Sequence, residues 1–159
     1  MEHLPEHGVL ISIKHCGIFL IGESGVGKSE TALQLIYQGA TLICDDAPNF
    51  IIDKDNTTIT GTCPEDFQGL IHIRDIGIIN IRELLGQRYV KKQHKIDYII
   101  ELIQDNTQEL TKLYLNINDA RCHYQHKQSL ISIPGIQIHI SQNRNIPMLV
   151  QTAITQLSI

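Results

Sequence analysis

The residues best suited to chemistry lie in the run Gly22-Glu23-Ser24-Gly25-Val26-Gly27-Lys28-Ser29. This run satisfies the pattern GxxxxGK[ST], in which the backbone N–H groups of a glycine-rich loop surround a phosphate. A helix that begins near Lys28 would direct the positive end of its dipole at the same site. The pattern therefore predicts that Lys28 contacts the β- and γ-phosphates of a nucleotide and that the Ser29 hydroxyl coordinates Mg²⁺.

Two adjacent carboxylates, Asp45 and Asp46, follow the short apolar segment 41–44. Mg²⁺ prefers oxygen ligands, and phosphoryl transfer benefits from a carboxylate that accepts the proton of the attacking hydroxyl. Adjacent residues of a strand point to opposite faces, so the pair can share one task only if the strand has ended. A turn or a helix-cap pair is the alternative. Because like charges side by side are costly without a cation, the metal interpretation is favoured.

The spacing of apolar residues predicts the elements that must position this site. A strand at 9–13 and a buried strand at 18–21 precede the glycine-rich run, and a helix begins at Lys28 and ends before Gly39. The run 96–103 fits a strand or a helix, and a strand is favoured. Residues 105–128 show no strong pattern. The other predicted elements are strands at 41–44, 50–52, 57–60 and 71–73, a helical turn at 79–85, a strand pair at 130–133 and 136–140 around Pro134-Gly135, and a closing helix at 148–157.

Length, composition and charge exclude several classes of protein. The 159 residues suffice for one α/β domain, and 42% hydrophobic residues argue against disorder. The formal net charge of -4 provides no positive field for nucleic acid or an anionic membrane. No apolar run approaches the ~20 residues that cross a bilayer, and the first residues do not resemble a signal peptide. The expectation is a soluble cytoplasmic protein that binds no nucleic acid and whose cysteines are reduced.

Five segments of the chain resemble, in combination, the sequence motifs of one protein family. They are GESGVGKSETALQLI from residue 22, CDD at 44–46, HGV at 7–9, IRDIGIINI at 73–81 and KIDYIIELI at 95–103. Together they resemble the catalytic domain of HPr kinase/phosphorylase. The resemblance covers essentially the whole chain, and it implies a P-loop-containing α/β domain with a mixed sheet, related to phosphoenolpyruvate carboxykinase. Residues 1–159 would form this single domain, without the amino-terminal domain common in that family.

The resemblance also implies an activity and a set of site residues. The activity is ATP- and Mg²⁺-dependent phosphorylation of a serine of the phosphocarrier protein HPr by a hexameric enzyme, which in reverse yields pyrophosphate. Lys28 and Ser29 resemble the phosphate-binding lysine and the magnesium-binding serine. Asp46 resembles the carboxylate that accepts the serine proton, with Asp45 beside the metal. His7 resembles the active-site histidine of the family's HG pair, near the phosphates.

The metal site departs from the family pattern LEIRG. His72 stands where that pattern has its metal-binding glutamate, and Asp75 stands where it has glycine. Imidazole is a poor ligand for Mg²⁺ and suits softer cations. Three alternatives follow: Asp45, Asp46 and water hold the ion, Asp75 compensates, or the metal preference has changed. The first is favoured.

Two further departures concern phosphate handling. The segment 139–144 aligns with the family motif PVRPGR, which is associated with dephosphorylation, and retains only Arg144. Weak or absent phosphorylase activity is therefore expected. Lys112 replaces an expected arginine, and lysine keeps the charge but loses the two-pronged grip on phosphate oxygens. These departures leave two alternatives open: a nucleotide-binding regulatory protein with altered or lost phosphotransfer, or a kinase for another substrate.

Overall fold

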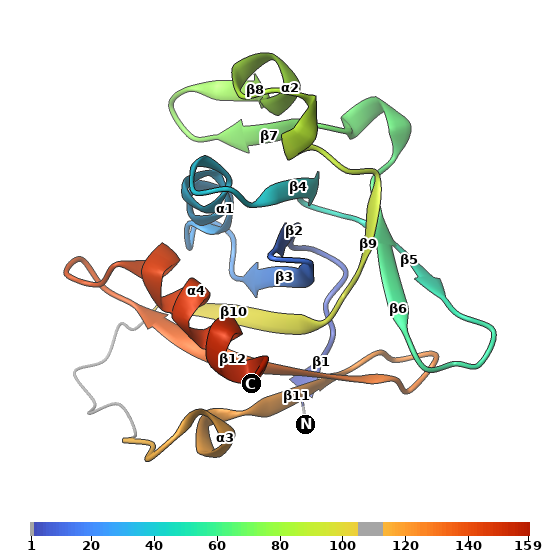
Figure 1. Cartoon of the computed structure of the whole chain (residues 1–159), viewed down its shortest axis with the longest axis vertical. Helices are drawn as coiled ribbons and strands as arrows, with labels where there is room; N and C mark the ends of the chain where they lie inside the picture. Colours follow the sequence, from blue (N-terminus) through green and yellow to red (C-terminus); the bar gives the residue numbers. More distant parts are fainter. Residues whose placement is uncertain (1, 105–112) are drawn as a thin grey trace.

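A seven-stranded mixed sheet runs through the middle of the structure, a computed structural model that describes residues 2–104 and 113–159 (Figure 1). Its strand order is β1-β11-β12-β10-β3-β2-β4. β10 is parallel to both β3 and β12, so the carboxyl ends of these three strands meet at one edge of the sheet. The strands are β1 (Glu2–His3), β2 (Val9–Ile13), β3 (Cys16–Gly22), β4 (Thr41–Cys44), β10 (Tyr98–Gln104), β11 (Cys122–Gln125) and β12 (Ser132–Ile140).

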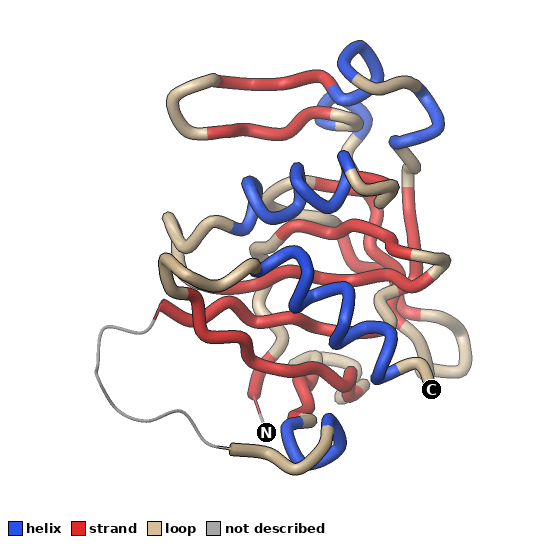
Figure 2. Tube along the Cα trace, turned by 60° about the vertical axis from the view of Figure 1, so that its left-hand side comes forward, coloured by secondary structure: helices blue, strands red, loops and turns tan. Residues whose placement is uncertain are grey.

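Different elements cover the two faces of this sheet. Helices α1 (Lys28–Tyr37) and α4 (Ile146–Leu157) lie side by side over one face, as Figure 2 shows, and Gln151 of α4 donates a hydrogen bond to Gln38 just after α1. The hairpin of β7 (Leu70–Ile73) and β8 (Gly77–Asn80) packs on the same side, beyond α1, and leads into α2 (Ile81–Leu84). A separate three-stranded sheet is formed by β5 (Asn49–Ile52), β6 (Ile59–Thr62) and β9 (Gln93–Lys95). The remaining short helices are η1 (Glu65–Phe67), η2 (Gln87–Tyr89) and α3 (Ile117–Ala120).

The core is divided by the sheet because neighbouring strand residues point to opposite faces. Leu20 of β3 packs in the cluster beneath α1 and α4, whereas Phe19 packs in the cluster that also contains Ile59 of β6. All five residues of β2 are buried because both of its faces are covered. No helix of the described residues is long and apolar enough to span a bilayer.

Most of the predicted elements are confirmed, with small shifts at their ends. The favoured strand at 96–103 is confirmed as β10. The predicted strand 57–60 forms two residues later as β6, and the predicted closing helix begins two residues earlier, at Ile146. The predicted helical turn 79–85 is divided, because Asn80 ends β8 and its side chain accepts a hydrogen bond from the Glu83 N–H at 3.3 Å, which caps α2.

The predicted strand pair around Pro134-Gly135 is wrong. Residues 132–140 form one continuous strand, β12, which is antiparallel to β11 and parallel to β10. Gly135 does not serve a turn: a Cβ there would overlap the carbonyl oxygen of Ile99, so glycine allows β10 to approach closely. β11 itself lies in the segment where the sequence indicates no element.

Candidate phosphate-binding site

The glycine-rich run forms the loop between β3 and α1, as its sequence predicts. Gly27 has φ 102° and immediately precedes α1, where its carbonyl accepts the N–H of Thr31 at 3.0 Å. The Lys28 ammonium donates to the carbonyl oxygens of Gly22 at 2.7 Å and of Glu23 at 3.0 Å. The loop therefore wraps around the side chain of its own lysine.

Burial in the loop gives Lys28 an unusual electrostatic setting. Desolvation lowers the pKa of its ammonium, and the negative charges of Asp46 and Asp45 oppose this shift. A charge that has lost part of its hydration interacts more strongly with an approaching anion than a charge on open surface does. The position of Lys28 therefore suits the binding of a phosphate.

Asp45 is joined to two of the surrounding elements. The Ser29 hydroxyl, in the first turn of α1, donates to Asp45 Oδ1 at 3.0 Å, and the backbone N–H of His72 in β7 donates to Oδ2 at 2.9 Å. Burial raises the pKa of the Asp45 carboxyl, although the two hydrogen bonds act against the shift. A carboxylate and a hydroxyl in contact are hard oxygen donors of the kind that Mg²⁺ prefers, so Ser29 and Asp45 fit this ion.

Asp46 is exposed and makes other contacts than Asp45 does. β4 ends at Cys44, and Asp46 has φ 73°, in the left-handed region that aspartate tolerates better than most residues. Its carboxylate lies 3.6 Å from His7 Nδ1, and both side chains are exposed, by 81% and 72% respectively. The backbone N–H of Gly8 donates to the Asp46 carbonyl at 2.6 Å. β4 thus ends before both aspartates, so strand alternation does not separate them, and both line one cavity although their hydrogen-bond and ion-pair contacts differ.

The other predicted metal and phosphate residues are placed less directly. His72 contacts Asp45 through its backbone, and its exposed side chain borders the site. Asp75 lies in the turn between β7 and β8 and does not line the cavity. Lys112 lies outside the described residues. Within residues 2–104 and 113–159, no three His, Cys, Asp or Glu side chains are grouped to hold a metal ion.

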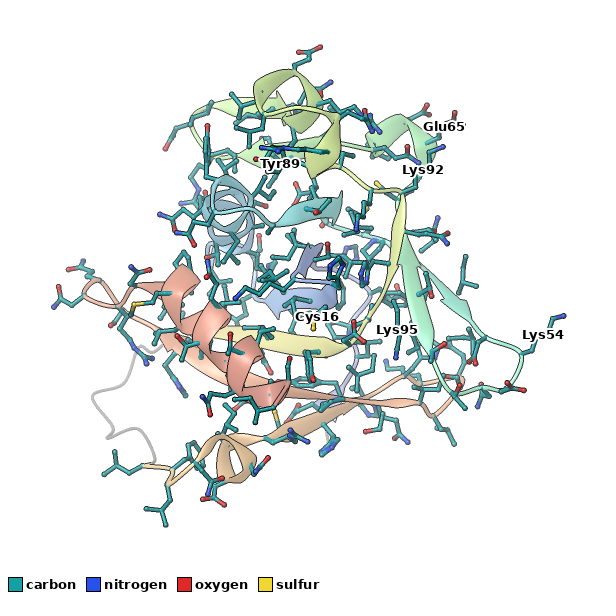
Figure 3. The ribbon with its side chains drawn as sticks, viewed as in Figure 1. Cys16, Lys54, Glu65, Tyr89, Lys92 and Lys95 are labelled. Atoms are coloured by element: carbon teal, nitrogen blue, oxygen red, sulfur yellow. The ribbon has the colours of Figure 1, made fainter. Side chains whose placement is uncertain are left out.

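A cavity of about 430 Å³ lies at the amino terminus of α1, and its lining includes Lys28, Ser29, Asp45, Asp46 and His72 but not His7. Arg74 also lines it, and its Nη2 would lie 3.2 Å from a Cβ on Gly25, so the guanidinium lies against the loop. Arg74 was not predicted as a site residue, although strand alternation would place residues 72 and 74 on one face. The basic residues Lys92 and Lys95 flank and end β9 and do not line this cavity (Figure 3).

A glycine-rich phosphate loop between a central strand and a helix, with a carboxylate after the next strand along the chain, defines an α/β domain of the P-loop class. The chain belongs to the HPr serine kinase family, since the model of the HPr Serine kinase C-terminal domain matches residues 2–159.

Relatives and a solved structure agree with this family. The chain is 37% identical over 149 residues to the HPr kinase/phosphorylase of Lactobacillus acidophilus, with 92% of this chain and 44% of the relative covered. It is 36% identical over 151 residues to that of Caldicellulosiruptor bescii, with 94% and 46% covered. The HPr(Ser) kinase/phosphatase structure from Coxiella burnetii matches with a TM-score of 0.83 and 30% identity, over 96% of this chain and 88% of that chain.

The match covers only part of each curated relative, and it agrees with the predicted fold class. The chain spans less than half the length of these curated relatives, 44% and 46%. The predicted fold class, a P-loop-containing α/β domain with a mixed sheet like that of phosphoenolpyruvate carboxykinase, is confirmed by the sheet topology and the structural match.

Proposed function

We propose that this chain is an ATP- and Mg²⁺-dependent kinase that phosphorylates a serine of the phosphocarrier protein HPr. The observation that carries the proposal is the convergence of Lys28, Ser29, Asp45 and Asp46 on one cavity at the amino terminus of α1. The name of the relatives, HPr kinase/phosphorylase, supports the acceptor. The exposure of Asp46 also supports a protein acceptor, because a serine on a large partner must reach this carboxylate.

In this proposal each residue has a chemical task. The loop N–H groups, Lys28 and Arg74 bind the phosphates, and Ser29 and Asp45 hold Mg²⁺. The ion, when bound, offsets charge on the phosphate oxygens. Asp46 accepts the proton of the attacking serine hydroxyl. His7, 3.6 Å from Asp46, orients this carboxylate and, when protonated, attracts a phosphate.

The finer parts of the proposal follow from the departures in sequence. We propose that the reverse, phosphorylase reaction is weak or absent, since the segment 139–144 keeps only the final arginine of the family motif. Release of phosphate from serine-phosphorylated HPr, with inorganic phosphate added, should therefore be much slower than the forward reaction. The proposal includes a cytoplasmic homo-oligomer, a hexamer by resemblance, and light scattering tests the number of subunits.

The proposed activity is tested by intact-protein mass spectrometry of HPr after incubation with the chain, ATP and Mg²⁺. The expected result is one added phosphate that is lost with Lys28→Ala, with Asp46→Asn and with HPr that lacks its target serine. ATP binding without any transfer to HPr would overturn the proposal.

The second candidate is a nucleotide-binding regulatory protein without phosphotransfer, or a kinase for another acceptor. The observation that favours it is His72, whose imidazole stands where a metal-binding carboxylate is expected. In the first case ATP binds and no acceptor is phosphorylated. In the second, a panel of proteins and small hydroxyl compounds contains an acceptor that reacts while HPr does not.

A further inference from the structure

A second groove, with a volume of about 650 Å³, opens beside the phosphate cavity. Its apolar walls come from three separate parts of the chain. They are Val26 and Leu33 from the loop and α1, Ile73 and Ile76 from the β7–β8 hairpin, and Ile140 and Pro147 from the end of β12 and the start of α4. Ser141 and Arg144 are among the polar residues of its lining. Apolar walls with a few polar groups are typical of sites for small organic molecules.

The groove is continuous with the phosphate cavity. Gly27 and Glu30, at the amino terminus of α1, line both spaces. A molecule whose phosphates lie on the loop can therefore extend into the groove without leaving the protein. The exposure of Ile76, 71% at the tip of the hairpin, places a large apolar side chain at the rim of this path.

A third groove, of about 490 Å³, also adjoins the phosphate cavity and shares no lining residue with the first groove. It is lined by Pro64 and Phe67, and it shares Asp45, Asp46 and His72 with the cavity. The carboxylate proposed to accept the serine proton thus borders this groove and does not line the first one. In phosphoryl transfer the attacking and leaving oxygens lie roughly in line on opposite sides of the phosphorus. If the acceptor approaches from the Asp46 side, the rest of the donor must leave from the other side.

We infer that the groove between α1, the β7–β8 hairpin and the start of α4 binds the nucleoside half of the donor nucleotide, with its heteroaromatic base between the isoleucine-rich walls. This inference rests on the proposed nucleotide binding and assigns the two grooves to donor and acceptor. Arg144, whose Nη1 donates to the His139 carbonyl at 2.6 Å, is held in the lining of the donor groove. Ile140, Ser141 and Arg144 of the divergent segment 139–144 thus line the proposed nucleoside site.

A single tryptophan reports on the groove, because the chain contains no natural tryptophan. Ile76→Trp places the reporter at the groove, and Ile51→Trp is the matched control, since Ile51 is an exposed isoleucine of β5 that lines none of these spaces. With Mg²⁺ present, ATP should change the emission of Ile76→Trp, and inorganic tripolyphosphate, which has no base, should not. Neither ligand should change the emission of Ile51→Trp.

Calorimetric titration of Ile76→Ser and Ile51→Ser provides a second measurement. Ile76→Ser should weaken ATP binding about tenfold and leave tripolyphosphate binding unchanged, because it removes apolar contact area from the base alone. Ile51→Ser should bind both ligands as the wild type does. If both ligands bind and Ile76→Ser keeps the wild-type ATP affinity, the inference alone is overturned. If neither ligand binds the wild type, the proposed function is overturned and the inference with it.

Discussion

Alanine at Gly27 tests whether the loop before α1 binds phosphate, and alanine at Gly39 is its matched control. Gly27 precedes the helix with φ 102°, Gly39 follows the same helix with φ 110°, and a Cβ at either position would meet no atom within 4 Å. The cost of each substitution is therefore backbone strain, about 1–2 kcal/mol for an L-residue. The lower entropy of the unfolded alanine chain offsets about 0.4–1 kcal/mol of this. Each variant should be about 1 kcal/mol less stable and melt about 2–4 °C lower.

The two variants should differ in ligand binding. Gly27→Ala alters the direction of the loop N–H groups, and loss of one hydrogen bond to a charged group costs about 1.5–3 kcal/mol. ATP affinity measured by calorimetry should fall about 10- to 100-fold, whereas Gly39→Ala should bind as the wild type does. Equal losses in both variants would show that helix stability controls binding. Wild-type affinity of Gly27→Ala would refute the assignment of the loop.

Three further predictions concern the carboxylates and the core. Asp46→Asn should slow phosphate transfer to HPr by about 10²–10⁴ while ATP affinity by calorimetry stays within about twofold of wild type; transfer at the wild-type rate would contradict its role as the base. Because burial raises the pKa of Asp45, the folded chain holds this proton more tightly than the unfolded chain, so its stabilising contribution is present below its ordinary pKa of 3.8 and is lost as pH rises through the folded value. Without Mg²⁺, urea unfolding should therefore show wild type losing stability relative to Asp45→Asn as the pH rises above about 4, and a constant difference would be inconsistent with this. The buried hydroxyl of Tyr124, a residue that is 1% exposed, donates a hydrogen bond to Glu101 at 2.9 Å. Tyr124→Phe should therefore lower the free energy of unfolding in urea by about 1–2 kcal/mol and leave ATP affinity unchanged. An unchanged urea midpoint would disprove the contribution of this hydrogen bond.

The phosphate loop around Lys28 could be predicted from sequence because its elements are consecutive in the chain. The strand, loop and helix around Lys28 follow one another without interruption, so apolar spacing and glycine positions are sufficient. The different contacts of Asp45 and Asp46 depend on the backbone after Cys44, where Asp46 has φ 73° and the Gly8 N–H donates to the Asp46 carbonyl. That hydrogen bond joins residues far apart in the sequence, so the spacing of the two aspartates leaves their tasks open.

The elements that sequence reasoning missed depend on pairing between distant strands. β11 is polar and short, and it forms because β12 and β1 pair with its two edges. Pro134-Gly135 indicates a turn when it is considered locally, but Gly135 is needed for contact with Ile99 on β10. Arg74 enters the site because the β7–β8 hairpin packs beside α1. In each case the deciding partner lies on another element, and one sequence carries no direct signal of that contact.

The structure also explains how the replacement at position 72 can leave the centre of the site intact. Asp45 is held by the Ser29 hydroxyl and by the backbone N–H of His72, and every residue except proline supplies such an N–H. If the residue at this position is a metal ligand, as the family pattern implies, its replacement would remove that ligand without releasing Asp45. The contact between Ser29 and Asp45 persists, which favours the proposal that aspartate and water hold the ion. In that proposal the change to His72 would alter the affinity for the metal more than the folding of the site.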